Sequence, residues 1–249
     1  MRSAAIAVAR EAGGLAVLFA RVVRALVPPT LDARELWRNL YKMGVLSVPI
    51  VMLTAFFTGG IMVIQSGIFV RRFGAQGLLG WGTGYAVFRE VGPILIALMF
   101  SGRVGANNTA ELGTMAVTEQ IDGLRALAIE PIRFLVVPRV VAMVVMLFAL
   151  TVCGDVVAIA GGALVGKLLL GVDLPVFWSS AQGNLKPWDL WHGLIKSLAF
   201  GLAVALSSCH FGMRTTGGAV GVGRAVNAAV VTAAVCIVLG DYLLTFLLG

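Results

Sequence analysis

Long apolar stretches are the feature that most constrains this chain. No residue between Lys42 and Arg71 carries a formal charge, and four more apolar stretches follow at about 85–106, 140–166, 190–212 and 225–248. A helix of roughly 20 apolar residues crosses the hydrocarbon core of a bilayer. A mean hydropathy of +0.96 with 12% charged residues is incompatible with a soluble domain of this length. The sequence therefore predicts an all-α membrane protein with five transmembrane helices, the first at about 44–67.

The N-terminal part has a different pattern. Residues 1–27 mix basic and apolar side chains without an uninterrupted apolar core, which is typical of an amphipathic helix in the membrane interface. Pro28-Pro29 should end this helix, and Thr30 or Asp32 should cap a short second helix. We therefore expect an N-terminal interfacial helical segment, 1–43, followed by a five-span membrane domain, 44–249.

Basic residues predict the orientation of the spans. The segments on the N-terminal side of the predicted membrane carry thirteen lysines and arginines, and the opposite loops carry four. Loops rich in these residues stay in the cytoplasm. This rule places the N-terminus and the 103–139 segment in the cytoplasm and the C-terminus on the outer side.

Ionisable residues inside the spans are candidates for function. Arg89, Glu90, Asp155, Lys196 and Asp241 all fall within predicted spans, where an isolated charge costs several kcal/mol. Arg89 and Glu90 are adjacent and point roughly 100° apart on a helix, so they should meet different partners and not each other. Each is expected to face a polar cavity or an opposite charge. The alternative is a structural role, either locking helices together or reaching the interface.

The segment 103–139 is the longest acid-rich part of the chain. Asn108 and Glu111 fit a capping pair that opens a helix, and Pro131 should stop it. Val117, Ile121, Leu124 and Ala128 recur on one helical face, away from Glu119, Asp122 and Arg125. A short helix of this kind can dock into a groove on a soluble partner. The alternative is a solvated loop without a role.

The sequence gives little support for a metal site, a phosphate-binding loop or nucleic-acid binding. His192 and His210 have no acidic or cysteine cluster beside them, so no metal site is expected. Gly161–Lys167 matches part of a phosphate-binding loop, but Leu168 stands where a Ser or Thr would bind magnesium, so its glycines are interpreted as a packing face. The basic residues are scattered among apolar spans, which argues against nucleic acid as a partner.

Several motifs together resemble one family. They are Arg89-Glu90-x-Gly92-Pro93, Ser101-Gly102-Arg103-x-Gly105, Ala110-Glu111-Leu112-Gly113 and Thr118-Glu119-Gln120-Ile121-Asp122. This pattern is similar to that of the MlaE/YrbE permease family, and the similarity covers roughly residues 30–249. That family supplies the membrane subunit of ABC transporters that work with MCE proteins on lipids.

The resemblance implies partners and a location. It implies a homodimer in the bacterial inner membrane, a cytoplasmic ABC ATPase dimer that binds ATP and magnesium, a periplasmic MCE hexamer, and in some systems a STAS-domain subunit. Phospholipid or a related lipid is the expected cargo. The chain itself is expected to hydrolyse nothing and to hold no cofactor.

The resemblance also implies roles for particular residues. The substrate cavity would use Arg89, Glu90, Lys196 and Asp155. The cytoplasmic coupling helix between the second and third spans would contact the ATPase through Glu111, Thr118, Glu119, Gln120, Ile121, Asp122 and Leu124.

Two alternatives from other classes remain open at this point. One is an ion- or proton-coupled secondary carrier that uses Arg89, Glu90, Asp155 and Asp241 as relay groups. Such carriers often contain inverted repeats, and no convincing pair of matching halves is visible in the sequence. The other is a membrane scaffold for a lipid enzyme.

Overall fold

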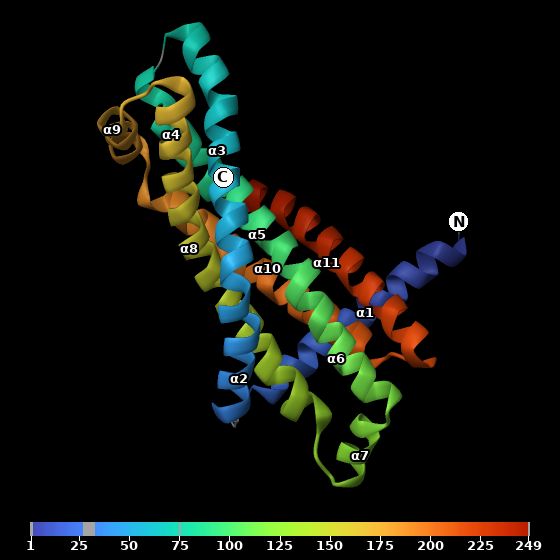
Figure 1. Ribbon diagram of the computed structural model, residues 1–249. Coiled ribbons are helices and arrows are strands. Elements are labelled where there is room, and N and C mark those ends of the chain that lie inside the picture. Colours follow the sequence, from blue (N-terminus) through green and yellow to red (C-terminus); the bar gives the residue numbers. More distant parts are fainter. Residues whose placement is uncertain (1, 27–32, 75, 249) are drawn as a thin grey trace. The chain divides into compact units, whose positions relative to one another are not determined.

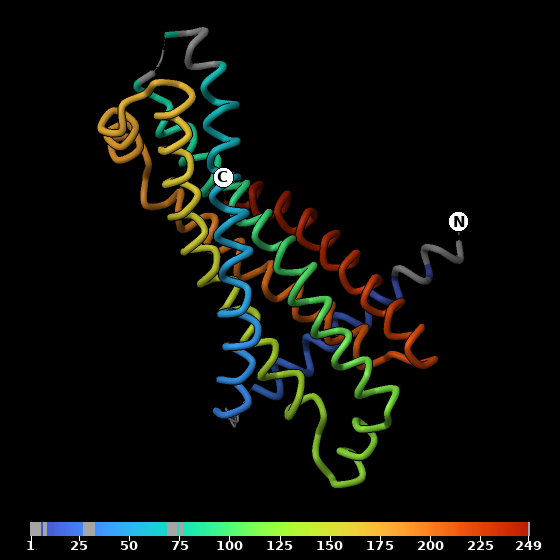
Figure 2. The backbone as a smooth tube through the Cα atoms, viewed as in Figure 1, coloured from blue at the N-terminus to red at the C-terminus, as the bar shows by residue number. Residues whose placement is uncertain are grey.

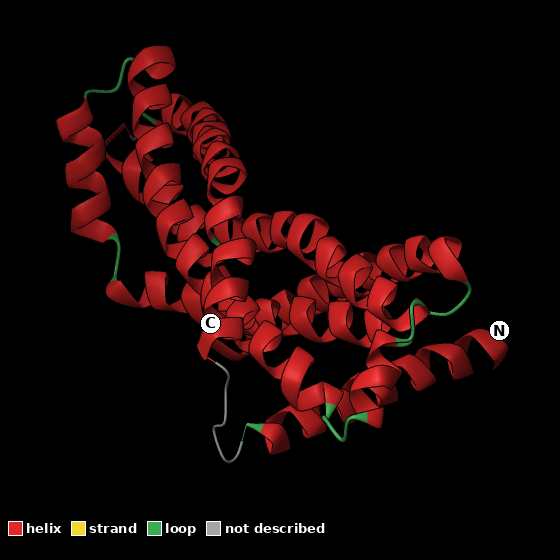
Figure 3. Ribbon diagram, turned by 60° about the horizontal axis from the view of Figure 1, so that its bottom comes forward, coloured by secondary structure: helices red, strands yellow, loops and turns green. Residues whose placement is uncertain are grey.

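The computed structural model describes residues 2–26, 33–74 and 76–248. Within these ranges every regular element is a helix and no strand occurs (Figure 3). The α-helices in Figure 1 are α1 (Arg2–Ala25), α2 (Ala33–Met43), α3 (Val48–Phe73), α4 (Leu79–Ala86), α5 (Gly92–Phe100), α6 (Ala106–Val117), α7 (Gln120–Ala126), α8 (Val137–Leu170), α9 (Leu174–Asn184), α10 (Pro187–Met213) and α11 (Gly218–Leu248). Short 3-10 segments, η1 (Val45–Ser47) and η2 (Gln76–Leu78), and π-helical turns, η3 (Val87–Val91), η4 (Ser101–Gly105) and η5 (Ile132–Val136), join or continue them.

Five helical segments are long and apolar enough to cross a membrane, as the sequence predicted. They are Ala33–Ile68, Leu79–Val117, Ile132–Leu170, Pro187–Met213 and Gly218–Leu248. An N-terminal helix precedes them, and the short α7 lies between the second and third spans. The predicted fold class is therefore confirmed: an all-helical membrane protein with one N-terminal helix and five spans.

The end of the second span was predicted wrongly. The hydropathy pattern placed it near Ala106, with a new helix capped at Asn108, but helical structure continues without a break through α6 to Val117. Asn108 does not cap a helix end; it is 1% exposed and donates a hydrogen bond from Nδ2 to Ser208 Oγ at 2.9 Å. A polar residue that finds a buried partner does not interrupt a helix, and hydropathy alone cannot detect this.

α1 has the amphipathic character that the sequence predicted. Leu18 and Val22 are buried, whereas Arg10, Arg21 and Arg24 are exposed. The predicted stop at Pro28-Pro29 and the predicted caps Thr30 and Asp32 lie outside the described residues.

The chain divides into two compact units, each built from three segments. Unit 1 comprises Met1–Val45, Phe100–Met146 and Gly201–Cys236, and unit 2 comprises Leu46–Met99, Leu147–Phe200 and Ile237–Gly249. The backbone tube in Figure 2 can be followed through these segments by its colour. Neither unit is a continuous stretch of sequence, because the long helices α8, α10 and α11 contribute residues to both.

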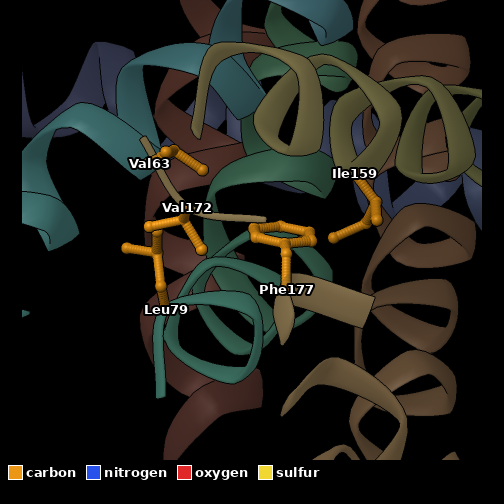
Figure 4. Close-up of a cluster of buried hydrophobic side chains, with 5 residues drawn as sticks. All are labelled: Val63, Leu79, Ile159, Val172 and Phe177. Atoms are coloured by element: carbon orange, nitrogen blue, oxygen red, sulfur yellow. The ribbon is translucent and has the colours of Figure 1, made fainter. Parts of the chain in front are cut away.

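Unit 2 has an apolar core contributed by α3, α4, α8 and α9 with the loop before α9. Phe177 is 1% exposed, and Figure 4 shows its ring facing Ile159, with Val172 and Leu79 nearby. The fifth member of the cluster, Val63, is fully buried. These contacts hold the short α9 against the membrane-spanning helices of the unit.

Glycines allow α3 and α8 to pack closely within unit 2. A Cβ at Gly59 would collide with the backbone carbonyl of Ala158, and a Cβ at Gly161 would collide with that of Phe56. Small residues at such crossings let helix backbones approach each other in lipid. Gly161–Lys167 therefore lies inside α8, in the packing role that the sequence analysis favoured over a phosphate-binding loop.

Candidate functional site

The motif Arg89-Glu90-x-Gly92-Pro93 distorts its helix in a defined way. Arg89 and Glu90 lie in the π-helical turn η3, where the Gly92 amide donates to the Val87 carbonyl, five residues back. Pro93 has no N–H, so the Arg89 carbonyl cannot receive the usual bond from four residues ahead. Lys196 Nζ on α10 fills this vacancy by donating to the Arg89 oxygen at 2.9 Å. The proline thus creates a hydrogen-bond acceptor inside a span.

Lys196 is the centre of a charged cluster in unit 2. It has no exposed surface, and its Nζ lies 2.7 Å from Glu90 Oε2 and 2.8 Å from Asp241 Oδ1. It also donates to Thr245 Oγ1 at 2.7 Å. A buried ammonium is tolerated when carboxylates and other acceptors surround it in this way. Each ionisable residue of the spans was expected to face a polar cavity or an opposite charge, and the structure brings Lys196 and Asp241 together with Glu90.

Arg89 points to different groups, as its position next to Glu90 predicted. Its Nη1 lies 3.3 Å from Asp189 Oδ1, and its guanidinium carbon lies 5.1 Å from the centre of the Tyr85 ring. The Arg89 side chain is 15% exposed. With Lys196 buried, Arg89 is the cation of the cluster that an incoming group can reach. An arginine presents several N–H donors in a planar fork, which suits phosphate or carboxylate.

Sequence reasoning missed Asp189. Its Oδ2 accepts a hydrogen bond from the Lys186 amide at 2.9 Å, so it also satisfies the first turn of α10. Pro187 at the first helical position and an acidic residue two positions later are a typical signal for a helix start. That signal explains why Asp189 is present, but the pattern gives no indication that it faces Arg89.

Asp155 lies apart from these contacts. It is 1% exposed on α8, and neither carboxylate oxygen has a hydrogen-bond partner among the described residues. It lines a small cavity of about 10 Å³ with Thr54, Thr58 and Gly92. A space of this size holds at most a water molecule. The role of Asp155 in the substrate cavity stays a prediction.

The predicted coupling segment forms a short helix in unit 1. α7 covers Gln120–Ala126, between the predicted start at Asn108 and the predicted stop at Pro131. Residues with positive φ stand on both sides of it, Glu119 at 59° and Ala128 at 57°. Such backbone conformations are uncommon for non-glycine residues and set the limits of this helix. It ends at Ala126, before Pro131, which was predicted to stop it.

The side chains of the coupling segment fall into two groups. Thr118, Glu119, Gln120 and Asp122 are exposed, whereas Ile121 is only 3% exposed. The sequence analysis assigned Ile121 to a groove on the partner, but its burial within the chain shows that it anchors α7. Leu124 is half-buried, and Leu127, directly after α7, is 72% exposed, so both leave apolar surface accessible on this segment.

Glu111 belongs to a network inside unit 1. Its Oε2 accepts from Lys42 Nζ at 2.7 Å, and its Oε1 lies 3.4 Å from Arg139 Nη2. Arg139 is 2% exposed and donates from Nη1 to Asn108 Oδ1 at 2.8 Å. This network ties α2, α6 and α8 together. Glu111 therefore already has two cationic partners within its own chain.

A metal centre has no support in the structure. Across residues 2–26, 33–74 and 76–248 no group of three or more His, Cys, Asp or Glu side chains is arranged to hold a metal ion. His210, one of the two histidines, instead lies 2.8 Å from Glu11 Oε2 on α1.

Comparisons with known proteins agree with these features. Residues 36–247 match the family described as Permease MlaE. The chain is 37% identical to a probable ABC transporter permease protein of Rickettsia conorii over 95% of this chain and 92% of that protein. It is 32% identical to the intermembrane phospholipid transport system permease protein MlaE of Haemophilus influenzae, over 84% of this chain and 80% of that protein.

A plant relative extends the comparison beyond bacteria. The chain is 36% identical to the chloroplastic protein TRIGALACTOSYLDIACYLGLYCEROL 1 of Arabidopsis thaliana, over 92% of this chain and 65% of that protein. The family match includes the five spans, apart from three residues at the start of the first and one at the end of the last, and it includes the Lys196 cluster and α7. The chain therefore belongs to the MlaE permease family and is the multi-pass membrane subunit, not the ATP-hydrolysing subunit, of an ABC transporter.

Proposed function

We propose that this permease moves phospholipid between the bacterial inner membrane and a periplasmic MCE protein. The relative in Haemophilus influenzae is described as part of an intermembrane phospholipid transport system. The observation in this chain that carries the proposal is the Lys196 cluster with the partly exposed Arg89 beside it. A purely apolar cargo offers no group that charges inside the spans could bind, whereas a lipid headgroup supplies a phosphate.

Arg89 is the residue that receives the phosphate in this proposal. Its contact with Asp189 is long, at 3.3 Å, and uses one of its five N–H donors. The remaining donors are available for a forked contact with phosphate oxygens. The Arg89 guanidinium also lies over the Tyr85 ring in a cation–π contact. Lys196 acts indirectly, because it holds Glu90 and the Arg89 carbonyl and thereby fixes the direction of the Arg89 side chain.

In this proposal a second copy of the chain completes the lipid cavity around Arg89. α11 leaves much of its apolar surface exposed, including Val231, Val235, Leu239 and Phe246. Asp241 and Thr245 of the cluster lie on this same helix. A homodimer that packs along α11 encloses the two Arg89 side chains in a shared cavity. α1 is assigned to the membrane interface, before the five-span domain.

ATP hydrolysis is assigned to a cytoplasmic ATPase dimer that contacts α7. The exposed Glu119, Gln120 and Asp122 supply polar contacts, and Leu124 with Leu127 supplies the apolar ones. ATP and magnesium are held by that partner. The N-terminus and α7 then lie in the cytoplasm and the C-terminus in the periplasm, which follows the distribution of lysine and arginine. A STAS-domain subunit is an optional further partner.

Copurification tests the assembly. A tagged copy of the chain is solubilised from native bacterial membranes in mild detergent, and the captured proteins are identified by mass spectrometry. We expect a P-loop ATPase and an MCE protein. Capture of neither, with a monodisperse and folded permease, would contradict the proposal and favour a carrier that works alone.

A further inference from the structure

Unit 1 contains a basic pocket that the transport proposal does not use. It lies between α1 and α10, has a volume of about 430 Å³, and is bordered by Arg10 and Arg21 of α1, Arg125 of α7 and Arg214 of α10. A volume of a few hundred Å³ is typical of a site for a small ligand. None of the residues that border it belongs to the Lys196 cluster, which lies wholly in unit 2.

The charge of the pocket is not balanced by the residues that the structure describes. Arg125 pairs with Asp122 at 2.6 Å, and Arg214 lies 3.6 Å from Glu11. Both pairs are well exposed, and such pairs contribute little attraction. Among the residues that the structure describes, Arg10 and Arg21 form no ion pair. The pocket therefore carries a net positive charge that an anionic ligand can neutralise.

The pocket is also partly apolar. Val17 and Leu18 of α1, Ile132 of η5 and Met213 of α10 line it together with the arginines. A free inorganic anion gains nothing from such a lining, whereas a phospholipid can place its phosphate on the arginines and its first methylenes on the apolar residues. Basic pockets between helices at the membrane surface are typical binding sites for anionic headgroups.

Neighbouring contacts hold the pocket open. The Glu11 carboxylate lies 2.8 Å from His210 Nε2 and ties α1 to α10. Gly14 permits this approach, because a Cβ there would lie 2.5 Å from the His210 ring. Gly13, one residue earlier, lines the pocket, and a Cβ there would meet no atom within 4 Å. α1 is thus fixed against α10 on one side of the pocket while space remains beside it.

A second cavity continues the basic surface. It has a volume of about 340 Å³ and is lined by Arg21, Arg24 and Arg133, with Glu130 as its acidic member. Arg21 borders both cavities. A headgroup larger than a single phosphate has room to extend in this direction.

We propose that the pocket between α1 and α10 binds the headgroup of an anionic phospholipid from the surrounding leaflet, separately from the lipid that is transported. The bound lipid neutralises Arg10 and Arg21 and fixes α1 against the spans. Because Arg125 lies on α7, lipid in the pocket also contacts the helix that is assigned to ATPase contact.

Photo-crosslinking tests this site. The full chain with its ATPase, carrying a photoreactive residue in place of Val17, is reconstituted into vesicles of equal amounts of phosphatidylglycerol and phosphatidylcholine. Val17 is 53% exposed and borders the pocket, so the substitution is expected to be tolerated. We expect crosslinks to phosphatidylglycerol to exceed those to phosphatidylcholine by at least about tenfold, since basic residues near the surface each favour anionic lipid.

Two variants locate the interaction, and two more serve as controls. Arg21→Gln combined with Arg214→Gln should bring the crosslinking ratio close to the mixing ratio of the vesicle. Gly13→Leu should have a similar effect by filling the cavity while it leaves every charge in place. Arg224→Gln removes an exposed charge from the same unit outside the pocket and should leave the preference unchanged. Arg89→Gln, in the transport cluster, should also leave it unchanged.

Several results would overturn the proposal. Equal crosslinking of the two lipids by the unmodified pocket would show that it has no anionic preference. A preference that survives both the double arginine variant and Gly13→Leu would place the lipid elsewhere. Loss of the lipid crosslink in excess inorganic phosphate would assign the pocket to a free anion. A preference that appears only without the ATPase would show that the partner covers this surface.

Discussion

Lys196 shows how a single residue organises charge inside a membrane span. Its ammonium has no exposed surface and contacts groups from η3 and α11, all within 2.9 Å. The Arg89 carbonyl is available to it because Pro93 cannot donate an amide hydrogen. Removal of one partner from such an arrangement leaves the remaining charges without a counter-ion. The resulting loss of stability is larger than the net stabilisation that the intact arrangement provides.

The first prediction concerns this compensation. Lys196→Met should lower the free energy of unfolding by about 3–5 kcal/mol, because Glu90 and Asp241 lose their counter-ion. Thermal unfolding of the purified protein in detergent measures the change. The matched control combines Lys196→Met with Glu90→Gln and Asp241→Asn, which removes the uncompensated charges. This triple variant should regain most of the stability but should not transport lipid. A stable Lys196→Met single variant would contradict the account of the cluster.

Asp155 provides the contrasting case. The hydroxyls of Thr54 and Thr58 beside it donate to backbone carbonyls of their own helix, each at 2.8 Å. No described residue forms an ion pair with Asp155, so its replacement removes no counter-ion.

We therefore predict that Asp155→Asn folds with a change in stability within about 1 kcal/mol and transports lipid at close to the normal rate. Thermal unfolding and a lipid-transfer assay measure the two effects. Complete loss of transport by a folded Asp155→Asn protein would show that this carboxyl carries a proton or a ligand, as in the alternative of a proton-coupled carrier.

At the scale of elements, the number of spans and their helical type followed from the sequence, but the ends of the helices and the short α9 did not. Hydropathy detects the part of a helix in the hydrocarbon and does not detect a polar extension. α6 continues past the predicted end because Asn108 has partners in Ser208 and Arg139, which are distant in the sequence. The π-helical turn η3 has a similar origin: Gly92-Pro93 is visible in the sequence, but the lysine that satisfies the freed carbonyl is not.

α7 is the short helix whose presence was predicted from its pattern. The alternation of apolar and acidic residues indicated a short helix with an exposed polar face, and the structure contains one. The pattern could not distinguish the apolar residue that anchors the helix, Ile121, from those that remain accessible, because both kinds share one face. Burial decides between them, and burial depends on the packing of unit 1.

The double substitution Glu119→Lys with Leu124→Ala should release the ATPase while the spans stay folded. It reverses a charge and shortens an apolar side chain on the accessible surface of α7. Copurification of the ATPase measures the loss, and we expect at least about a tenfold decrease. The control is Gln182→Lys, an exposed substitution on α9, which lies between the third and fourth spans. Full retention of the ATPase and of transport by the α7 variant would mean that another surface couples the two subunits.

At the scale of the whole molecule, the distribution of charge predicts the orientation in the membrane. Single cysteines at Arg10 and Arg24, in a chain whose three native cysteines are replaced by alanine, should react with a membrane-impermeant reagent from the cytoplasm. Both positions are exposed. A cysteine at Trp178 on α9, which is 51% exposed, should react from the periplasm. The reverse pattern of labelling would invert the proposed topology.

The assembly is the level at which the sequence alone predicts least. Composition and periodicity established five spans and a charged second span, but they contain no information about what covers α11. Its exposed apolar side chains face lipid, a second copy of the chain, or both. The proposed homodimer therefore rests on the family resemblance and on the position of Asp241 and Thr245 on this same helix.

The central claim is that Arg89 receives the phosphate of a transported phospholipid. The most direct measurement is ATP-dependent transfer of radiolabelled phospholipid from vesicles containing the permease–ATPase complex to the MCE protein. Arg89→Lys keeps the charge but loses the forked donor. We predict normal assembly and ATPase binding with transfer slowed by at least about tenfold, since a hydrogen bond to a charged group contributes roughly 1.5–3 kcal/mol. Transfer at the unmodified rate by an intact Arg89→Lys complex would contradict the claim.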